Sequence, residues 1–223
     1  MTKDDAIKKL LRLAGYQVGY TADKHKHNKY AEYFDEEYPT FYNGKKNGYD
    51  WCDCFVDWLF VQTFGKDTGR MMVYQPLKSC GAGVSWSYKY YKEAGAVVHD
   101  PQPGDQIFFA DEDGLYHTGI VETVDALKVY TIEGNTGYKP LGGVNRFSYS
   151  KKNAAIYAYG RPDWSAAVEK VDTAEIDRIC DKIAALTEAT LRGEYGNNPE
   201  RASRLGAWYT PVQFVINEYY KKE

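Results

Sequence analysis

A cysteine and a histidine stand where the sequence predicts regular secondary structure. Cys52 falls in the first turn of a helix predicted over residues 52–64, and His117 begins a strand predicted over residues 117–124. The unpaired N–H groups and the dipole of a helix N-terminus favour the thiolate form of a cysteine there. An imidazole within reach can accept a proton and return it during acyl transfer. The two residues therefore predict nucleophilic chemistry by cysteine.

The spacing of the four cysteines resembles no compact disulfide framework, so we interpret Cys52, Cys54, Cys80 and Cys180 as mainly free thiols. The Cys-x-Cys pair lacks the second pair of ligands that a zinc site needs. On a helical wheel, Cys54 points away from an apolar stripe made by Cys52, Phe55, Val56, Leu59 and Phe60. Only Cys52 can meet a base on a sheet packed against this stripe. The alternative is that both cysteines are small buried hydrophobic residues.

Among the four histidines, His117 is the one that a rigid element would hold. His25 and His27 lie in a loop rich in Lys and Asp, which indicates solvent exposure, and His99 precedes a turn. A general base needs a fixed position relative to its nucleophile. His117 is therefore the predicted base.

A hairpin supplies candidates for the third group. A loop at residues 125–127 would place His117 opposite Asn135 and Gly119 opposite Glu133. These side chains would share one face of the sheet, with the Cβ atoms of directly opposed residues about 4.5–5.5 Å apart. Glu133 or Asn135 can then hydrogen-bond the imidazole and fix its tautomer, with Gly119 leaving space. The alternative is a set of polar side chains on an exposed sheet face, and the residues alone favour neither.

The elements around these residues predict an α+β fold, an antiparallel sheet packed on helices. Residues 16–50 show little periodicity and predict an ordered loop. Consecutive strands with tight turns favour antiparallel pairing. Helices are predicted over residues 3–14, 52–64 and near 84–94, and about five strands over a segment beginning at Gln106–Phe109 and over residues 117–124, 128–135, 144–149 and 156–161.

The pattern changes near Arg161, after which the sequence is entirely helical. A short helix is predicted from Asn198-Pro199 to Gly206, and another starts at Thr210-Pro211. We therefore expect a main domain over residues 1–162, a linker over 163–173 and a small three-helix bundle over 174–223.

Composition excludes several classes of protein. The formal net charge is −3 and no block of Lys or Arg stands out, so we expect no nucleic-acid partner. No apolar run is long enough to cross a bilayer, and the N-terminal residues lack the pattern of a signal peptide. We therefore expect no membrane partner and synthesis in the cytoplasm. The 21 tyrosines fit sugar binding as well as packing, and packing is the commoner role.

Four segments, in order and spacing, resemble the CHAP domain, the cysteine, histidine-dependent amidohydrolase/peptidase. They read YDWCDCFVDW from Tyr49, PGDQI from Pro103, YHTGIV from Tyr116 and IEGNT from Ile132, within a resemblance over roughly residues 10–162. The resemblance implies a papain-like fold and a catalytic domain over residues 1–162. In that family the cysteine directly follows the tryptophan, which again selects Cys52 over Cys54.

The resemblance implies Cys52 as nucleophile, His117 as base and Glu133 as orienting group, with Asn135 assisting. It implies cleavage of an amide bond in peptidoglycan, as an N-acetylmuramoyl-L-alanine amidase or as an endopeptidase of stem peptides or cross-bridges. The Cys52 backbone N–H would help to form the oxyanion hole. Flanking aromatic residues are the expected substrate contacts, with the first of them a candidate second oxyanion donor: Tyr49, Trp51 and Tyr116.

Some relatives bind calcium, and one segment here is acidic enough to raise that possibility. It is Asp111-Glu112-Asp113-Gly114, on one turn. A solvated loop is the commoner meaning of such a run. We therefore expect no cofactor and no metal, and keep calcium as the alternative.

Roughly residues 174–220 resemble the Cpl-seven-type cell-wall-binding repeat, which implies a three-helix bundle that recognises peptidoglycan. The candidate contacts are Tyr195, Asn197, Arg201 and Arg204, which offer aromatic and guanidinium groups for sugar and carboxylate. The alternative is a dimerisation or stabilising bundle. Because one copy binds weakly, self-association into a homo-oligomer would help through avidity.

Taken together, these features lead us to expect a phage or prophage endolysin that acts on the cell wall after another factor releases it. One alternative is a non-lytic wall-binding protein with a decayed hydrolase domain, against which the intact Cys52, His117, Glu133 and Asn135 argue. A second is a papain-like amidase toxin used between bacteria. The residues do not decide between amidase and endopeptidase, because the shape of the pocket determines it.

Overall fold

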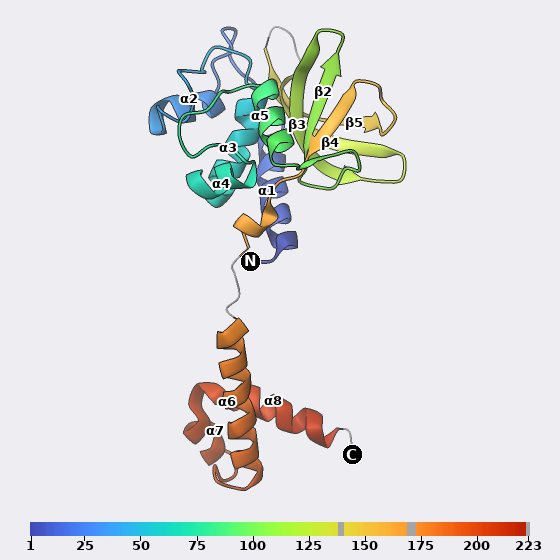
Figure 1. The fold of residues 1–223 in the computed structure, drawn as a ribbon. Coiled ribbons are helices and arrows are strands. Elements are labelled where there is room, and N and C mark those ends of the chain that lie inside the picture. The colour runs from blue at the N-terminus through green and yellow to red at the C-terminus, as the bar shows by residue number, and fades with distance from the viewer. Residues whose placement is uncertain (138–140, 169–172, 222–223) are drawn as a thin grey trace. The chain divides into compact units, whose positions relative to one another are not determined.

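The chain forms two compact units, Met1–Glu169 and Lys170–Glu223, which we describe separately (Figure 1). The computed structural model describes residues 1–137, 141–168 and 173–221. Part of the predicted linker, residues 169–172, lies outside the described residues. Within the described residues, no helix combines the length and the apolar character that a membrane crossing requires.

The first unit contains a six-stranded antiparallel sheet in the order β1-β6-β2-β3-β4-β5. The mixed α+β class with an antiparallel sheet is therefore confirmed. The two-residue strand β1 was not predicted, because two valines carry no alternation to read. The strands are β1 Val97–Val98, β2 Gln106–Asp111, β3 Gly114–Val124, β4 Lys128–Thr136, β5 Gly143–Ser150 and β6 Ile156–Gly160.

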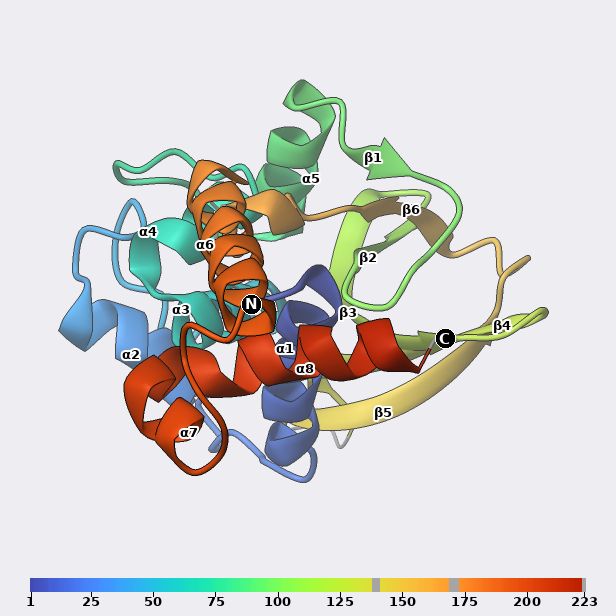
Figure 2. The same ribbon diagram turned by 90° about the horizontal axis from the view of Figure 1, so that it is seen from below.

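Helices cover one face of this sheet (Figure 2). The first helix begins with a capping box, in which the Thr2 hydroxyl accepts from the Asp5 N–H and the Asp5 carboxylate accepts from the Thr2 N–H. The helices are α1 Lys3–Gln17, α2 Lys29–Glu37, α3 Cys52–Phe64, α4 Lys66–Met72 and α5 Val84–Glu93, and the unit closes with a 3-10 turn, η1 Trp164–Ala166.

Helix α2 corrects the prediction that residues 16–50 form only loop. Asn28 caps it, with its side-chain oxygen accepting from the Ala31 N–H at 2.9 Å. The buried residues Tyr30, Ala31 and Phe34 face the core, but charged neighbours in a nine-residue helix hide that spacing. Such a short helix forms through tertiary packing, which a local sequence pattern does not reveal.

Helix α3 spans Cys52–Phe64, with the bounds that the sequence predicts. The expected single apolar stripe is wrong, because nearly every residue of the helix is buried, including Asp53 and Asp57. Other chain segments cover the side that faces away from the sheet. The Asp57 carboxylate, for example, accepts hydrogen bonds from Tyr42 at 2.6 Å and Gln75 at 2.8 Å. The helix is therefore the centre of the unit, and its first residue has a fixed position.

The two faces of the sheet belong to different hydrophobic clusters because strand side chains alternate. Phe108, Ile120 and Ile132 pack with the helices in the main core. Ile107, Phe109, Val121, Val129 and Tyr159 form a smaller cluster on the other face. His117 and Glu133 have the same parity as the residues of this second cluster, and of helix α3 only the first residue, Cys52, lines their cavity.

The β3–β4 hairpin confirms part of the predicted register and corrects the rest. Ile120 pairs with Ile132, as the prediction requires, whereas Val124 pairs with Val129 instead of Lys128. A β-bulge between Val121 and Thr123 absorbs the difference of one residue. The register is therefore as predicted at Ile120 and Val121 and wrong at the tip of the hairpin.

The second unit contains helices around a small core of Leu205, Val212 and Ile216. The helix predicted from Thr210 begins one residue earlier, at Tyr209. A short 3-10 turn, η2 Gly206–Trp208, precedes it. The helices are α6 Thr173–Leu191, α7 Glu200–Leu205 and α8 Tyr209–Tyr220.

Candidate active site

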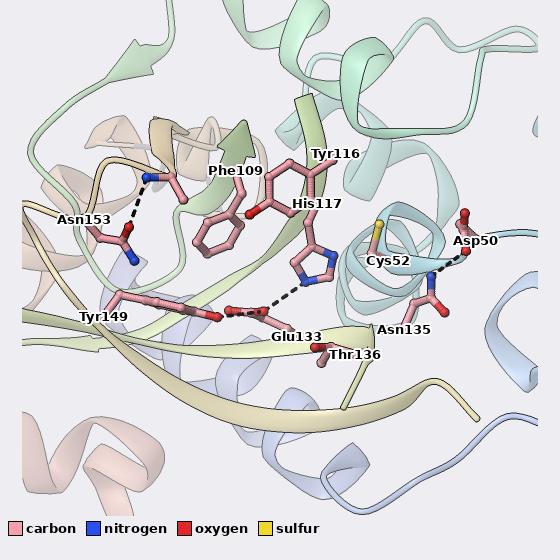
Figure 3. A pocket seen from close by; sticks show the side chains of 11 residues that line it. Asp50, Cys52, Phe109, Tyr116, His117, Glu133, Asn135, Thr136, Tyr149 and Asn153 are labelled. Atoms are coloured by element: carbon pink, nitrogen blue, oxygen red, sulfur yellow. Dashed lines mark hydrogen bonds and ion pairs between the residues drawn. The ribbon is translucent and has the colours of Figure 1, made fainter. Parts of the chain in front are cut away.

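Cys52, His117 and Glu133 come from three elements and line one cavity of about 560 Å³ (Figure 3). Cys52 is the first residue of α3, His117 lies within β3, and Glu133 lies within β4. His117 is therefore held inside a strand of the sheet, although it does not begin that strand as predicted. The predicted meeting of helix start and hairpin is present.

The carboxylate of Glu133 holds one ring nitrogen of His117. Nε2 of His117 lies 2.9 Å from Oε2 of Glu133, whose side chain is 1 % exposed. Thr131 donates its hydroxyl to Oε1 of the same carboxylate, and the Tyr149 hydroxyl donates to Oε2 at 3.3 Å. A carboxylate with partners on both oxygens has little freedom to turn. Glu133 is therefore suited to fix the orientation of the imidazole.

The other ring nitrogen of His117 faces the Cys52 sulfur (Figure 3). Burial of the ring favours its neutral form, but the hydrogen bonds and negative charges of Cys52 and Glu133 outweigh burial and raise the pKa of His117 to about 10. The imidazole is therefore protonated at neutral pH. A protonated imidazole beside the sulfur can act as the acid in acyl transfer.

Cys54 has a different environment, on the far side of the helix. It is fully buried, and burial together with the nearby Asp53 and Asp57 raises its thiol pKa well above the usual range. It does not line the cavity that contains His117. Of these two cysteines, only Cys52 is placed to react.

Two glycines allow this assembly to close. A Cβ on Gly134 would lie 2.7 Å from Cβ of Phe55 and 2.8 Å from a ring carbon of Trp51, so α3 packs directly on the β4 backbone there. A Cβ on Gly119 would lie 2.5 Å from Cγ of Glu133. The expectation that Gly119 leaves space for Glu133 is confirmed. Gly134 therefore allows α3 to pack closely on β4, and Gly119 leaves room for the Glu133 side chain.

Asn135 does not face His117, which corrects the predicted pairing of the two residues. Its backbone has φ of +58°, and its side-chain amide donates to Oδ1 of Asp50 at 3.0 Å. The same oxygen accepts from the Lys26 ammonium at 2.6 Å. The hydrogen bond from Lys26, supported by that from Asn135, holds the pKa of the Asp50 carboxyl below its usual range. Asn135 therefore lines the cavity as a partner of Asp50.

The three predicted substrate-contacting aromatic residues have different positions. Tyr116 lines the cavity and is 51 % exposed. Trp51 is fully buried, stacks on Tyr30 with ring centroids 5.3 Å apart, and cannot contact a substrate. Tyr49 is 67 % exposed and lines a neighbouring cavity, so it is not placed as an oxyanion donor beside Cys52. The prediction of a substrate contact is therefore wrong for Trp51, and packing is its role here.

Several residues that line the cavity or hydrogen-bond Glu133 were not predicted as site residues. Thr131 lies two positions before Glu133 on the same strand, so side-chain alternation could have identified it. Asp50 lies within the segment around Cys52 but carried no independent signal. Tyr149 reaches Glu133 from β5, and Phe109 packs near His117 with ring centroids 5.8 Å apart. The last two contacts depend on the registers of other strand pairs, which the local pattern does not supply.

The candidate wall-binding residues of the second unit are partly engaged within the unit. Arg201 donates from Nε and Nη2 to the Gly196 carbonyl at 3.0 and 2.9 Å, so its guanidinium supports a turn. The Arg204 guanidinium lies over the Tyr195 ring at 5.4 Å. Asn197 is exposed beside them. Tyr195 and Arg204 are therefore one stacked pair, and wall binding by this unit stays a prediction.

The acidic segment Asp111-Glu112-Asp113-Gly114 lies at the β2–β3 connection. The Asp113 N–H donates to the Asp111 carboxylate at 3.0 Å, which satisfies that side chain locally. Among the residues that the structure describes, no group of three or more potential ligands is gathered to hold a metal ion.

Comparisons with known proteins agree with this geometry. The family profile described as the CHAP domain matches residues 44–135, somewhat less than half of the chain. Neither the curated proteins nor the solved structures gave a match. A CHAP domain implies hydrolase or amidase-type activity on peptidoglycan in general. Because the matched segment contains Cys52, His117 and Glu133, the match supports a CHAP-domain protein.

Proposed function

We propose that the protein cleaves an amide bond of peptidoglycan by cysteine nucleophilic catalysis, with a papain-like arrangement of helix and sheet. One observation carries the proposal. The sulfur at the start of α3 faces one nitrogen of His117, and a buried carboxylate holds the other nitrogen. Acyl transfer needs a nucleophile, a base and an orienting group arranged in this spatial order.

The reaction begins with the thiolate of Cys52 attacking the carbonyl carbon of the amide. The tetrahedral intermediate collapses when the His117 imidazolium gives its proton to the nitrogen of the leaving amine and the C–N bond breaks. A water molecule then attacks the thioester while His117 takes one of its protons. The C–S bond breaks, the carboxylic acid leaves, and the imidazolium and thiolate are restored.

The start of α3 also supplies a donor for the oxyanion. The N-cap residue Trp51 makes no side-chain cap hydrogen bond. The hydrogen bond from the Phe55 N–H to the Trp51 carbonyl is the first of the helix, so the N–H groups before Phe55 precede the regular ladder. The Cys52 N–H has no partner within a regular helix. A donor beside the attacking sulfur stabilises the negative charge that develops on the carbonyl oxygen.

Digestion of purified cell walls tests the proposal. Cys52→Ala should lower wall solubilisation at least about 1,000-fold, because the nucleophile is lost. Cys54→Ala is the matched control, two residues away on the buried side of the same helix, and should retain activity. Full activity in Cys52→Ala would refute the catalytic assignment.

Mass spectrometry of the digest identifies the bond that is cut. New amino termini within the peptides indicate an endopeptidase, and free lactyl groups on the sugar indicate an amidase. The endolysin role, with action on the wall after release from the cytoplasm, is our leading biological context. A non-lytic wall-binding protein would bind walls and release no product.

The second unit is proposed to bind the wall through Tyr195 and Arg204. The guanidinium, which also pairs with Glu200 at 3.6 Å, lies over the ring, so a cation and an aromatic edge share one surface. Arg204→Ala in the full chain should reduce the fraction that co-sediments with walls. Unchanged sedimentation would favour the stabilising or dimerising role, which the oligomeric state in solution would then reveal.

A further inference from the structure

A second cavity, of about 470 Å³, adjoins the cavity that contains Cys52 and His117. Asp50 lines both cavities, and Tyr49, Lys45 and Lys46 line only the second. In the close-up, Cys52 lies between His117 and Asp50 (Figure 3). The second cavity therefore begins on the side of the nucleophile away from the imidazole. We call it the Lys45 cavity.

Two lysines line the Lys45 cavity, and neither is ion-paired within the described residues. The side chain of Lys45 is exposed and makes no ion pair within the described residues. The Lys46 ammonium donates to the neutral side-chain oxygen of Asn43 at 2.8 Å, so its charge also lacks a counterion there.

Two acidic groups beside these lysines have other partners. Asp50 is paired with the Lys26 ammonium at 2.6 Å. The Asp35 carboxylate accepts backbone N–H groups, from Lys46 at 2.9 and 3.1 Å and from Asn47 at 2.9 Å. Neither carboxylate forms an ion pair with Lys45 or Lys46, so the Lys45 ammonium is available to an anionic group of a ligand.

The chemistry of acyl transfer determines which half of a substrate reaches this cavity. The leaving amine must lie near His117, because it receives its proton from that ring. The carbonyl carbon must bond to the Cys52 sulfur. The acyl half therefore extends away from His117, past Asp50 and towards Lys45. This assignment depends on the proposed function.

We propose that the Lys45 cavity is an acyl-side subsite that binds a free carboxylate of a peptide through Lys45 and Lys46, with the exposed ring of Tyr49 packing against the peptide. An amidase acting at the sugar would place a lactyl group on a neutral N-acetylated sugar in this position, which brings no carboxylate. A carboxylate-bearing peptide on the acyl side therefore makes the protein an endopeptidase.

Two synthetic stem peptides that differ in one group test the proposal. In one, a carboxyl on the acyl side of the scissile amide is free, and in the other it is amidated. The free form should show a KM roughly fivefold lower, the size expected for solvent-exposed ion pairs with two lysines. The two forms should have similar kcat values, because the carboxylate is distant from the reacting atoms.

The double variant Lys45→Gln/Lys46→Gln should raise the KM of the free peptide to that of the amidated one. Lys128→Gln, at the exposed tip of the β3–β4 hairpin, is the matched control for loss of a lysine and should leave both constants unchanged. Circular dichroism and thermal melting of the double variant check that it is folded. Equal KM values for the two peptides in the wild type, or an unchanged KM in the double variant, would overturn the subsite.

A binding measurement separates failure of the subsite from failure of the proposed function. Cys52→Ala should bind the free peptide more tightly than the amidated one, with the preference weakening as salt is added. Preferential binding without hydrolysis by the wild type would preserve the subsite and overturn the hydrolase proposal. Hydrolysis without a preference for the free peptide would preserve the hydrolase proposal and overturn the subsite. Release of lactyl groups alone would overturn the endopeptidase assignment.

Discussion

Nε2 of His117 and Oε2 of Glu133 lie 2.9 Å apart, on adjacent strands, with the carboxylate withdrawn from solvent. Glu133→Gln keeps the size of the side chain and removes its charge, so the pKa of His117 should fall from about 10. The alkaline limb of the kcat/KM profile should move to lower pH, because the imidazolium is lost earlier. We also expect the rate to fall roughly 100-fold, since the ring is held less firmly. An unchanged alkaline limb would contradict the role of the carboxylate.

The raised pKa of His117 also predicts how stability depends on pH. A group whose pKa is higher in the folded state binds its proton more tightly there. Its stabilisation is present in full below the unfolded value near 6.5 and is lost as pH rises through about 10. The melting temperature of the wild type should therefore decline more between pH 7 and roughly 10 than that of His117→Gln. Parallel melting curves for the two proteins would refute this linkage.

Tyr149→Phe and Thr131→Val each remove one hydrogen bond to Glu133 and leave the other. A hydrogen bond to a buried carboxylate contributes about 1.5–3 kcal/mol, although the remaining partner limits the loss. Each variant should lower kcat/KM roughly three- to tenfold, with KM little changed. Their effects should exceed additivity when combined, because both act on one carboxylate. Additive effects would indicate that the two hydroxyls act independently of each other.

Gly134→Ala should be destabilising and inactivating together. The new Cβ would lie 2.7 Å from Phe55 and 2.8 Å from Trp51, and both are fully buried and cannot move aside. Overpacking of this kind costs about 1–3 kcal/mol. Chemical denaturation measures the loss, and wall digestion measures activity.

Gly119→Ala is the informative comparison with that variant. Its Cβ would lie 2.5 Å from Cγ of Glu133 and 2.9 Å from the Ile132 carbonyl oxygen. We expect it to displace the orienting carboxylate, so that activity and the alkaline limb change even in a preparation that is fully folded. Loss of stability with normal activity per folded molecule would show that the glycine serves packing alone.

Sequence patterns predicted those parts of the fold that depend on local chemistry. Cys52–Phe64 was predicted to the residue, because an apolar run with a glycine after it has few alternatives. The pairing near Ile120 was correct because alternation fixes which residues face each other. Helix α2 was missed because its burial depends on contacts distant in sequence.

The candidate site was predictable to the extent that it follows strand alternation. Glu133 and His117 could be placed on one face of the hairpin for that reason. The left-handed backbone of Asn135 redirects its side chain to Asp50, and no pattern of residue types announces such a conformation at a non-glycine position. The burial of Trp51 likewise depends on aromatic neighbours such as Tyr30, which come from a helix that the pattern did not reveal.

The bulge at Glu122 separates the two ends of the β3–β4 hairpin. Arg146 holds Glu122 through two nitrogens, Nε at 2.8 Å and Nη2 at 2.9 Å from its carboxylate oxygens, so the extra residue has an anchor of its own. A change in loop length beyond this anchor would be absorbed before it reached the strand positions that carry the imidazole. The exposed tip is therefore a natural place for grafting an epitope or a fluorescent tag, and for natural length variation during divergence.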